Sequence, residues 1–508
     1  MKPPFHSYIL AIALLIGLSA CSVKGSGTVT AGSSPTPATE TSRLRPASEI
    51  PASPASPAPR PAAQSPTPSA PASPNDRYTL YATLDYGQHH LAVTELITYT
   101  NRTTQALPDL VLMVDPMYFS GTFHLTSLTW VDGKGIDNAS QENGQIHILL
   151  PQPLAVGAQV VLSISYELNL PSPVSSPTPR PVPFGYSARQ TNLVNWYPFI
   201  PPYIPGKGWL AHPAGYFGEH LVYDVADFEV NIRLLDKRQD LKIAASAPAH
   251  QAGDWQHYEL NTARNFAWSV SDQYQVMTET VGTVTVIGYA FPYDVTAGQA
   301  ALKAAAQALQ VYGELVSPYP RDYFSLVEAD FLDGMEYDGL VFLSRGFYNT
   351  YDGTPKGYLT FITAHETAHQ WWYALVGNDQ ALEPWLDESL TTYAERLFYE
   401  RTNPDLVAWW WSYRVDYYEP QGAINRSIYD FQSSPQPYTA YRNTVYLNGA
   451  HFLEDLRRLI GDEAFFAFLK DFTAQNAHRL ATTESFFSIL KAHTQADLTP
   501  LLKKYFSN

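Results

Sequence analysis

The segment His365-Glu366-Thr367-Ala368-His369 constrains this chain more than any other feature of its sequence. In an α-helix, residues four positions apart lie on one face, so both imidazoles can point at a single metal ion. Glu366 is then placed to take a proton from a water molecule on that ion. The pattern serves this purpose only within a helix, and we expect one from Leu359 to Val376.

Glu388 is the candidate for a third metal ligand. A catalytic zinc ion usually has three protein ligands, and Glu388 lies 19 positions after His369 at the start of the next predicted helix. Two histidines and one glutamate suit zinc, so we expect one zinc ion per chain. Asp387 and Glu395 are candidates for orienting these ligands through hydrogen bonds, although an exposed helix face would explain Glu395 equally well.

The composition argues against several other classes of protein. The chain of 508 residues has 32 basic and 48 acidic residues, a formal net charge of −16 and no basic block. Nucleic-acid binding needs clustered lysine and arginine, so no nucleic-acid partner is expected. The single cysteine excludes an intramolecular disulfide and a cysteine-rich zinc module.

The N-terminus has the pattern of a secretory signal. Lys2 precedes an apolar run from Tyr8 to Leu18, and small residues follow directly before Cys21. This arrangement resembles a bacterial lipobox, which implies a signal peptide at residues 1–20, a lipidated Cys21 and a location outside the cytoplasm on the cell membrane. A signal anchor, or a secreted form with an incidental cysteine, are the alternatives. Residues 21–76 are rich in proline, serine and alanine, which predicts an unfolded stalk.

The remaining chain divides by its periodicity. Residues 77–272 contain short alternating segments such as Tyr78–Leu84 and Leu91–Tyr99, which predict an antiparallel β sandwich or saddle-shaped sheet. Residues 273–508 contain strand-like segments followed by helices, which predict an α+β domain.

Three motifs, which follow one another along the chain in the family's order, resemble the aminopeptidase N family of gluzincin zinc peptidases, which includes leukotriene A4 hydrolase. The first is the zinc segment, continued by Gln370-Trp371-Trp372 and by Trp385-Leu386-x-Glu388, with 18 residues between His369 and Glu388 as in the family. The second is Gly334-Met335-Glu336, which resembles the family's Gly-x-Met-Glu-Asn strand and places Glu336 29 residues before His365. The third is Tyr446-Leu447-Asn448-Gly449, which resembles the family's Tyr-x-Lys-Gly segment.

The resemblance implies a thermolysin-like α+β zinc peptidase domain that removes N-terminal residues from peptides. It implies that a zinc-bound water attacks the peptide bond with Glu366 as the general base, and that Tyr446 stabilises the oxyanion. Tyr441 is a further contributor to consider. It also implies that Glu336 binds the free α-amine of the substrate, with Gly334 and Met335 on an edge strand that pairs with the substrate backbone.

The chain departs from the family pattern at several places. Asp333, Tyr337 and Asn448 replace residues that are usual in the family, which leaves a zinc endopeptidase of the same fold as an alternative. A non-catalytic, zinc-stabilised peptide-binding protein is the other alternative. Gln190 and Asn195 are candidates for the sandwich-domain residue that helps to hold the amine in relatives. Only 120 residues follow Glu388, so we expect the family's large C-terminal helical domain to be missing.

Overall fold

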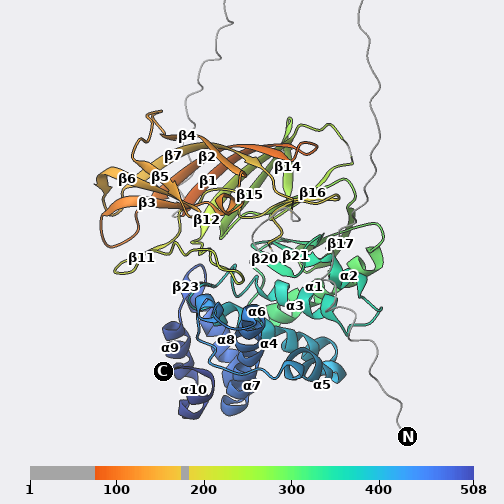
Figure 1. Ribbon diagram of the computed structural model, residues 1–508. Helices are drawn as coiled ribbons and strands as arrows, with labels where there is room; N and C mark the ends of the chain where they lie inside the picture. Colours follow the sequence, from red (N-terminus) through yellow and green to blue (C-terminus); the bar gives the residue numbers. More distant parts are fainter. Residues whose placement is uncertain (1–74, 173–181, 239, 508) are drawn as a thin grey trace, which may run out of the picture. The chain divides into compact units, whose positions relative to one another are not determined.

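The computed structural model describes residues 75–172, 182–238 and 240–507 (Figure 1). The predicted signal peptide, Cys21 and nearly all of the predicted stalk lie outside these ranges. Within them, a β-rich region is followed by an α+β region, as the sequence predicts. None of the described helices is both long and apolar enough to cross a membrane.

The β-rich region is built on a seven-stranded sheet with the strand order β14-β15-β12-β1-β2-β7-β4. Its strands are β1 (Asp76–Asp85), β2 (His90–Thr100), β4 (Phe123–Trp130), β7 (Gln159–Asn169), β12 (Ala226–Leu234), β14 (Ala249–Ala252) and β15 (Trp255–Ala263). The expectation of a purely antiparallel sheet is wrong for one pair, because β1 and β12 run parallel. Residues 86–225 separate these two strands, and this leaves ample chain for β12 to enter the sheet from the same end as β1.

Smaller sheets complete the β-rich region. They contain β3 (Leu107–Met113), β5 (Ala139–Glu142), β6 (Gln145–Leu154), β8 (Gly185–Tyr186), β9 (Thr191–Leu193), β10 (Tyr203–Ile204), β11 (Gly208–Trp209), β13 (Lys242–Ala245) and β16 (Trp268–Ser271), with a short 3₁₀ helix, η1 (Asp115–Tyr118). Trp196 and Trp268 are fully buried in the core, with their rings edge to face at 5.9 Å. This geometry is favourable for aromatic pairs and adds to the large apolar area that the two rings bury.

Glu95 interrupts the apolar alternation of β2. It lies at an inward position between Val93 and Ile97, is completely buried, and neither carboxylate oxygen has a hydrogen-bond partner among the described residues. Burial raises the pKa of Glu95 well above the usual value of a glutamate. A buried carboxylate without a partner is costly, so the folded state favours the protonated form.

Replacement of Glu95 by glutamine is therefore expected to stabilise the protein at neutral and alkaline pH. The pKa of Glu95 is higher in the folded than in the unfolded state. Buried Glu95 therefore destabilises the protein least at a pH below the unfolded pKa, and this destabilisation grows as the pH rises. The gain from E95Q should increase by up to about 1.4 kcal/mol per pH unit in this window. Urea unfolding at pH 5 and pH 8 measures it, with E167Q on the exposed face of β7 as the control. An equal gain at both pH values would contradict the prediction.

The α+β region begins with a five-stranded sheet of order β17-β18-β19-β21-β20. Its strands are β17 (Gln275–Val281), β18 (Val284–Ala290), β19 (Tyr323–Ala329), β20 (Gly334–Tyr337) and β21 (Leu340–Ser344). The central strands run parallel, and β21 is mostly apolar and buried at every position, as expected for a strand covered on both faces. Val341 and Leu343 pack into the core of the helical region, whereas Leu340 and Phe342 pack into the core of the β-rich region. The sheet therefore lies between the two cores, and β20 forms one edge.

Helices cover one face of this sheet and complete the region. The first three are α1 (Val295–Leu315), α2 (Arg345–Asn349) and α3 (Tyr358–Ala368). The later helical segments are α4 (Trp385–Thr402), α5 (Val407–Trp410), η4 (Trp411–Val415), α6 (Pro437–Tyr441), η7 (Arg442–Asn448), α7 (Gly449–Ile460), α8 (Asp462–Asn476), α9 (Thr483–His493) and α10 (Thr499–Tyr505). Three further 3₁₀ turns are η3 (Pro404–Leu406), η5 (Asp416–Tyr418) and η6 (Ile428–Phe431), and β22 (Gly377–Asn378) pairs with β23 (Leu480–Ala481). Helix α3 contacts both α1 and α4.

The expected extent of the zinc-segment helix is wrong at its C-terminal end. Helix α3 ends at Ala368, eight residues before the predicted end at Val376. The Gln370 side chain forms hydrogen bonds with the backbone of the β20–β21 turn. It donates to Tyr337 O and accepts from Gly339 N. These bonds, together with the buried indoles that follow, outweigh the helical propensity of the segment.

Candidate active site

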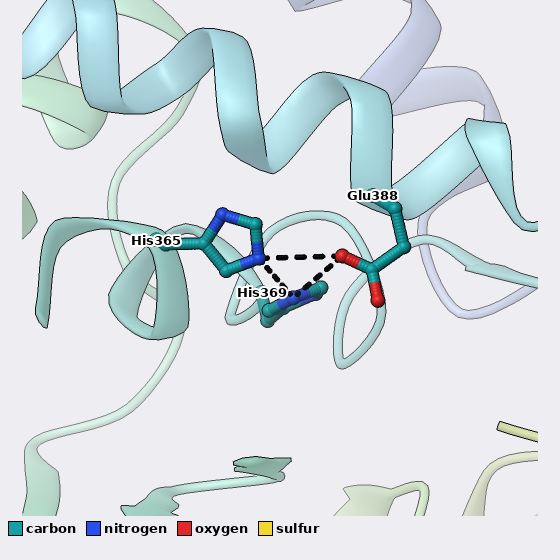
Figure 2. A group of neighbouring side chains, drawn as sticks. All are labelled: His365, His369 and Glu388. Carbon is teal, nitrogen blue, oxygen red and sulfur yellow. Dashed lines mark hydrogen bonds and ion pairs between the residues drawn. The ribbon is translucent and has the colours of Figure 1, made fainter. Parts of the chain in front are cut away.

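Two neighbouring helices bring the three predicted metal ligands together (Figure 2). His365 and His369 come from the end of α3, and Glu388 comes from the first turn of α4. The Nε2 atoms of the histidines are 3.3 Å apart, and Glu388 Oε2 lies 3.3 Å from His365 Nε2 and 3.7 Å from His369 Nε2. All three side chains are buried, and their ligand atoms lie within 4.8 Å of one another.

The other nitrogen of each imidazole is bonded to the protein. His365 Nδ1 lies 3.0 Å from Glu395 Oε1, and His369 Nδ1 lies 3.0 Å from the carbonyl oxygen of Trp372. Because these oxygens only accept, both Nδ1 atoms are assigned the proton and both Nε2 atoms present lone pairs. Two lone pairs and a carboxylate oxygen that face one another repel unless a cation lies between them. The three residues therefore fit a metal ion, and the donor set suits zinc.

Burial also keeps His369 in the neutral form that can ligate a metal. It lowers the pKa of His369 well below the usual value, and the neighbouring His365 lowers the pKa further. An uncharged imidazole is the form that binds a metal ion.

Glu395 lies behind His365 and fixes its ring. It accepts two hydrogen bonds from Arg414, at 3.0 and 2.9 Å, and one from the Trp410 indole at 2.9 Å. Burial raises the pKa of Glu395, but the charge of Arg414 and the hydrogen bonds from His365 and Arg414 outweigh burial, so that the pKa falls below its usual value. The alternative of an exposed helix face is wrong, since Glu395 is completely buried.

Asp387 lies beside the ligands without touching an imidazole. It accepts hydrogen bonds from the side chains of Asn378 and Gln380, at 3.1 and 2.8 Å, and from the backbone N–H of Glu388 at 3.0 Å. Burial raises the pKa of Asp387 to about 7, with a further contribution from Glu219. Asp387 therefore fixes the start of α4 and, through it, the position of Glu388.

Glu366 lies between the metal-ligand cluster and the edge strand β20. It is buried, and its Oε2 atom has no hydrogen-bond partner among the described residues. Burial raises the pKa of Glu366 well above its usual value, and the charges of Glu336 and Glu388 add to this against the opposing effect of His365. A carboxylate with an unused acceptor beside a metal site is what a general base requires.

Gly334 provides the space that Glu366 occupies. A Cβ atom at position 334 would lie 2.0 Å from Glu366 Oε1 and 2.6 Å from its carboxyl carbon. No side chain larger than hydrogen fits there unless the carboxylate moves, so the glycine of this motif is a steric requirement for the position of Glu366.

Replacement of Gly334 by alanine is expected to displace the Glu366 carboxylate and to slow the peptide hydrolysis predicted from the sequence by about 10- to 100-fold, because displacing a catalytic group by about 1 Å has effects of this size. Zinc content should stay unchanged, since the three atoms nearest to a Cβ at position 334 all belong to Glu366 and not to a predicted ligand. Steady-state rates and metal analysis check both points. The control is G313A, because a Cβ at position 313 on α1 meets no atom within 4 Å. Full activity in G334A would contradict the prediction.

Tyr446 faces the metal ligands from η7. Its hydroxyl donates a short hydrogen bond to Glu388 Oε1, and its ring lies nearly parallel to that of His365 at 5.9 Å. The Tyr441 ring packs against Tyr446, edge to face at 5.5 Å. The structure thus brings both predicted tyrosines to the site, with Tyr446 in direct contact with a ligand.

A glycine also lets this tyrosine segment approach α4. A Cβ at Gly449 would lie 2.0 Å from the hydroxyl oxygen of Ser389, which follows Glu388 directly. The same hydroxyl donates a hydrogen bond of 2.7 Å to the carbonyl oxygen of Val445. These contacts hold the residue before Tyr446 against the helix that carries the third ligand.

Glu336 lies on the edge strand β20 beside the metal-ligand cluster. Atoms of Glu336, Glu366 and His369 lie within 4.8 Å of one another, and Gln380 donates to Glu336 Oε1 at 3.2 Å. Burial raises the pKa of Glu336 well above its usual value, and the next largest effect comes from Glu219. This concentration of carboxylates favours a positively charged group of a ligand.

These residues line a pocket with a volume of about 470 Å³. The pocket is also lined by residues of the β-rich region, namely Tyr216, Phe217, Gly218 and Glu219. Sequence reasoning missed Glu219, because no motif surrounds it and it lies 117 positions before Glu336. Gln190 is buried elsewhere, bonded to Tyr274 and to Glu328 O. Asn195 bonds Asp115 and Tyr223 and does not line this pocket, but it lines a small neighbouring cavity together with Glu219 and Glu336.

The three departures from the family pattern have different surroundings. Asp333 lines the pocket and accepts a 2.8 Å hydrogen bond from Tyr438. Tyr337 is buried in the core of the β-rich region, and Asn448 donates to Gly422 O at 2.7 Å. Only Asp333 therefore adds a charge to the pocket itself.

Comparison with known proteins places these observations in a family. Residues 300–505 match the peptidase family M1 domain. Aminopeptidase N of Lactobacillus helveticus is 28% identical over 226 residues, which are 40% of this chain and 26% of that protein. Endoplasmic reticulum aminopeptidase 1 of mouse is 32% identical over 148 residues, 28% of this chain and 16% of the relative. The matched stretch thus spans about a quarter of the length of the first curated relatives.

Solved structures match over a longer range. An M1 zinc metallopeptidase from Deinococcus radiodurans is 18% identical with a TM-score of 0.57, covering 84% of this chain and 92% of that one. A mutant of the M1 zinc metallopeptidase from this organism, bound to a Tyr-Ser-Ala substrate, gives a TM-score of 0.59 at 19% identity, covering 84% and 93%. The β-rich region followed by an α+β domain is therefore the fold of these two proteins.

The fold and the two-histidine, one-glutamate cluster define a gluzincin-type protein. Residues 300–505 carry the peptidase family M1 domain, and the aminopeptidases N of two bacteria are among the similar proteins, as the motifs predict.

Proposed function

We propose that this chain is a zinc-dependent aminopeptidase that removes N-terminal residues from peptides. The observation that carries the proposal is the position of Glu336, a buried carboxylate on an edge strand within 4.8 Å of Glu366 and His369. A free α-ammonium group bound there would place the first peptide bond of the substrate beside Glu366. The names of the curated relatives and the solved relative with a bound Tyr-Ser-Ala substrate support the same reaction class.

His365, His369 and Glu388 would hold the zinc ion. When bound, zinc supplies Lewis acidity at the scissile carbonyl and makes water a better nucleophile at neutral pH. Glu366 takes a proton from the attacking water as the new C–O bond forms. It then gives this proton to the leaving nitrogen as the C–N bond breaks, which yields a free amino acid and a shortened peptide.

Other residues orient the substrate in this scheme. The Tyr446 hydroxyl gives up its hydrogen bond to Glu388 Oε1 and donates instead to the oxyanion that develops on the carbonyl oxygen. Glu336, with Glu219 beside it, binds the ammonium group and disfavours acylated N-termini, which have no positive charge. Gly334 and Met335 present an unpaired strand edge, to which an extended peptide can add.

The test compares free and N-acetylated versions of the same peptides with the purified, zinc-loaded protein. Mass spectrometry should show stepwise loss of N-terminal residues from the free peptides alone. A chelator should abolish the loss, and added zinc should restore it. Internal cuts in both sets would instead indicate an endopeptidase. No cuts with stoichiometric zinc bound would indicate a peptide-binding protein.

We also propose that the enzyme is tethered outside the cytoplasm through a lipidated Cys21. The sequence carries this proposal, through the apolar run and small residues before the single cysteine. Mass spectrometry of the N-terminal peptide from the membrane fraction tests it, since a diacylglyceryl group on Cys21 is expected and an unmodified thiol would contradict it.

A further inference from the structure

The active-site pocket has two ends of different character. Glu219 and Glu336 lie at one end, where the proposed function places the substrate amine. Glu336 lies within 4.8 Å of His369, at the C-terminal end of α3, whereas Ile362 and Tyr358 lie one and two turns before Glu366, toward the N-terminal end of that helix. Arg442 also lines the pocket and lies one turn before Tyr446 on η7.

Two arginines line this pocket, and they differ in how they are paired. Arg414 is buried and forms two hydrogen bonds with Glu395, so its charge is neutralised by a carboxylate. Arg442 forms no ion pair within 4.0 Å with any described carboxylate. The pocket therefore contains one guanidinium group whose charge is not matched by a neighbouring acid.

The Arg442 side chain is held in place by neutral groups. Its guanidinium lies over the Tyr418 ring at 4.1 Å, and its Nε and Nη2 donate to Asn443 Oδ1 at 3.1 and 2.8 Å. Asn443 in turn donates to Tyr418 O at 3.1 Å. Tyr418 shares a hydroxyl hydrogen bond of 3.1 Å with Tyr358, which lines the pocket. An arginine that is positioned in this way loses little freedom when an anion binds.

We propose that Arg442 binds a carboxylate of the substrate downstream of the scissile bond. Arg442 and Tyr446 are about one turn of η7 apart, and an extended peptide advances about 3.4 Å per residue. Because Tyr446 faces the scissile carbonyl in the proposed function, on which this inference rests, Arg442 reaches the first or second residue beyond the cut. The carboxylate is either the C-terminus of a dipeptide or tripeptide or an Asp or Glu side chain at that place.

The test measures binding, so that it does not depend on turnover. Zinc-loaded protein carrying E366Q is titrated calorimetrically with Ala-Ala-Ala, with its C-terminal amide, and with Ala-Ala-Glu amide. We expect the free acid or the glutamyl amide to bind about tenfold more tightly than the neutral amide, as a charge-assisted hydrogen bond provides. Preference for the acid alone identifies the C-terminus, and preference for the glutamyl amide identifies a side chain.

Adding R442Q should remove this preference, and R442K should retain part of it. The matched control is R426Q, because Arg426 is also half-buried and stacked on an aromatic ring, Phe431 at 4.2 Å, but does not line the pocket. Equal binding of all three peptides to the E366Q protein that retains Arg442 would overturn the proposal. A preference that persists after R442Q is added would overturn it as well. Failure of the proposed function is seen separately, as the absence of peptide cleavage by the unmodified enzyme.

Discussion

Replacing Glu366 with glutamine is expected to lower the turnover number for peptides by about a thousandfold or more, the upper part of the range for a general acid–base. Glutamine has nearly the same shape, so it leaves the space beside Gly334 filled in the same way. It cannot take a proton from water, however, and the reaction loses the group that carries the proton to the leaving nitrogen. Binding of peptides should change far less than turnover.

The E366Q experiment needs zinc analysis beside the kinetics. Glu366 is not among the three residues whose atoms form the ligand cluster, so one zinc ion per chain should remain after the substitution. The control is E314Q, an exposed glutamate on α1 that should keep full activity. If E366Q loses its zinc together with its activity, the assignment of Glu366 as a base rather than a ligand is wrong.

The parts of the fold that follow from local pattern could be predicted from the sequence. The alternation in Tyr78–Leu84 and Leu91–Tyr99 marks β1 and β2, because one face of each strand is buried. The parallel pairing of β1 with β12 could not be predicted, since the order of strands depends on contacts between distant segments. The early end of α3 was missed for a similar reason, because side-chain bonds from Gln370 to another element decide it.

The site shows the same division. His365 and His369 follow from helical spacing, and Glu388 follows from the length of the connecting loop. Glu219 comes from the β-rich region, where no spacing rule connects it with the zinc segment. The partner of Glu395 is likewise a tertiary contact, since Arg414 is brought to it by the chain that follows α4. From the sequence alone, the residues that carry out the reaction are therefore easier to identify than the residues that select the substrate.

Glu336 is the residue that we expect to select for a free N-terminus. In E336Q, hydrolysis of peptides with a free amine should fall by about 100-fold, since removing one partner of a buried ion pair costs about 3 kcal/mol or more. The amide oxygen of glutamine can still accept the hydrogen bond from Gln380, so the edge strand should keep its structure. N-acetylated peptides carry no ammonium group, and their slow hydrolysis should therefore be unchanged or slightly faster.

The ratio of rates for free and acetylated peptides is the decisive quantity, because a general loss of structure would lower both rates together. We expect this ratio to fall by about two orders of magnitude in E336Q. It should stay unchanged in E279Q, a control at an exposed position on β17, which forms the opposite edge of the same sheet. If the ratio is unchanged in E336Q as well, Glu336 does not bind the amine, and Glu219 and Asp333 become the next acidic residues of the pocket to test.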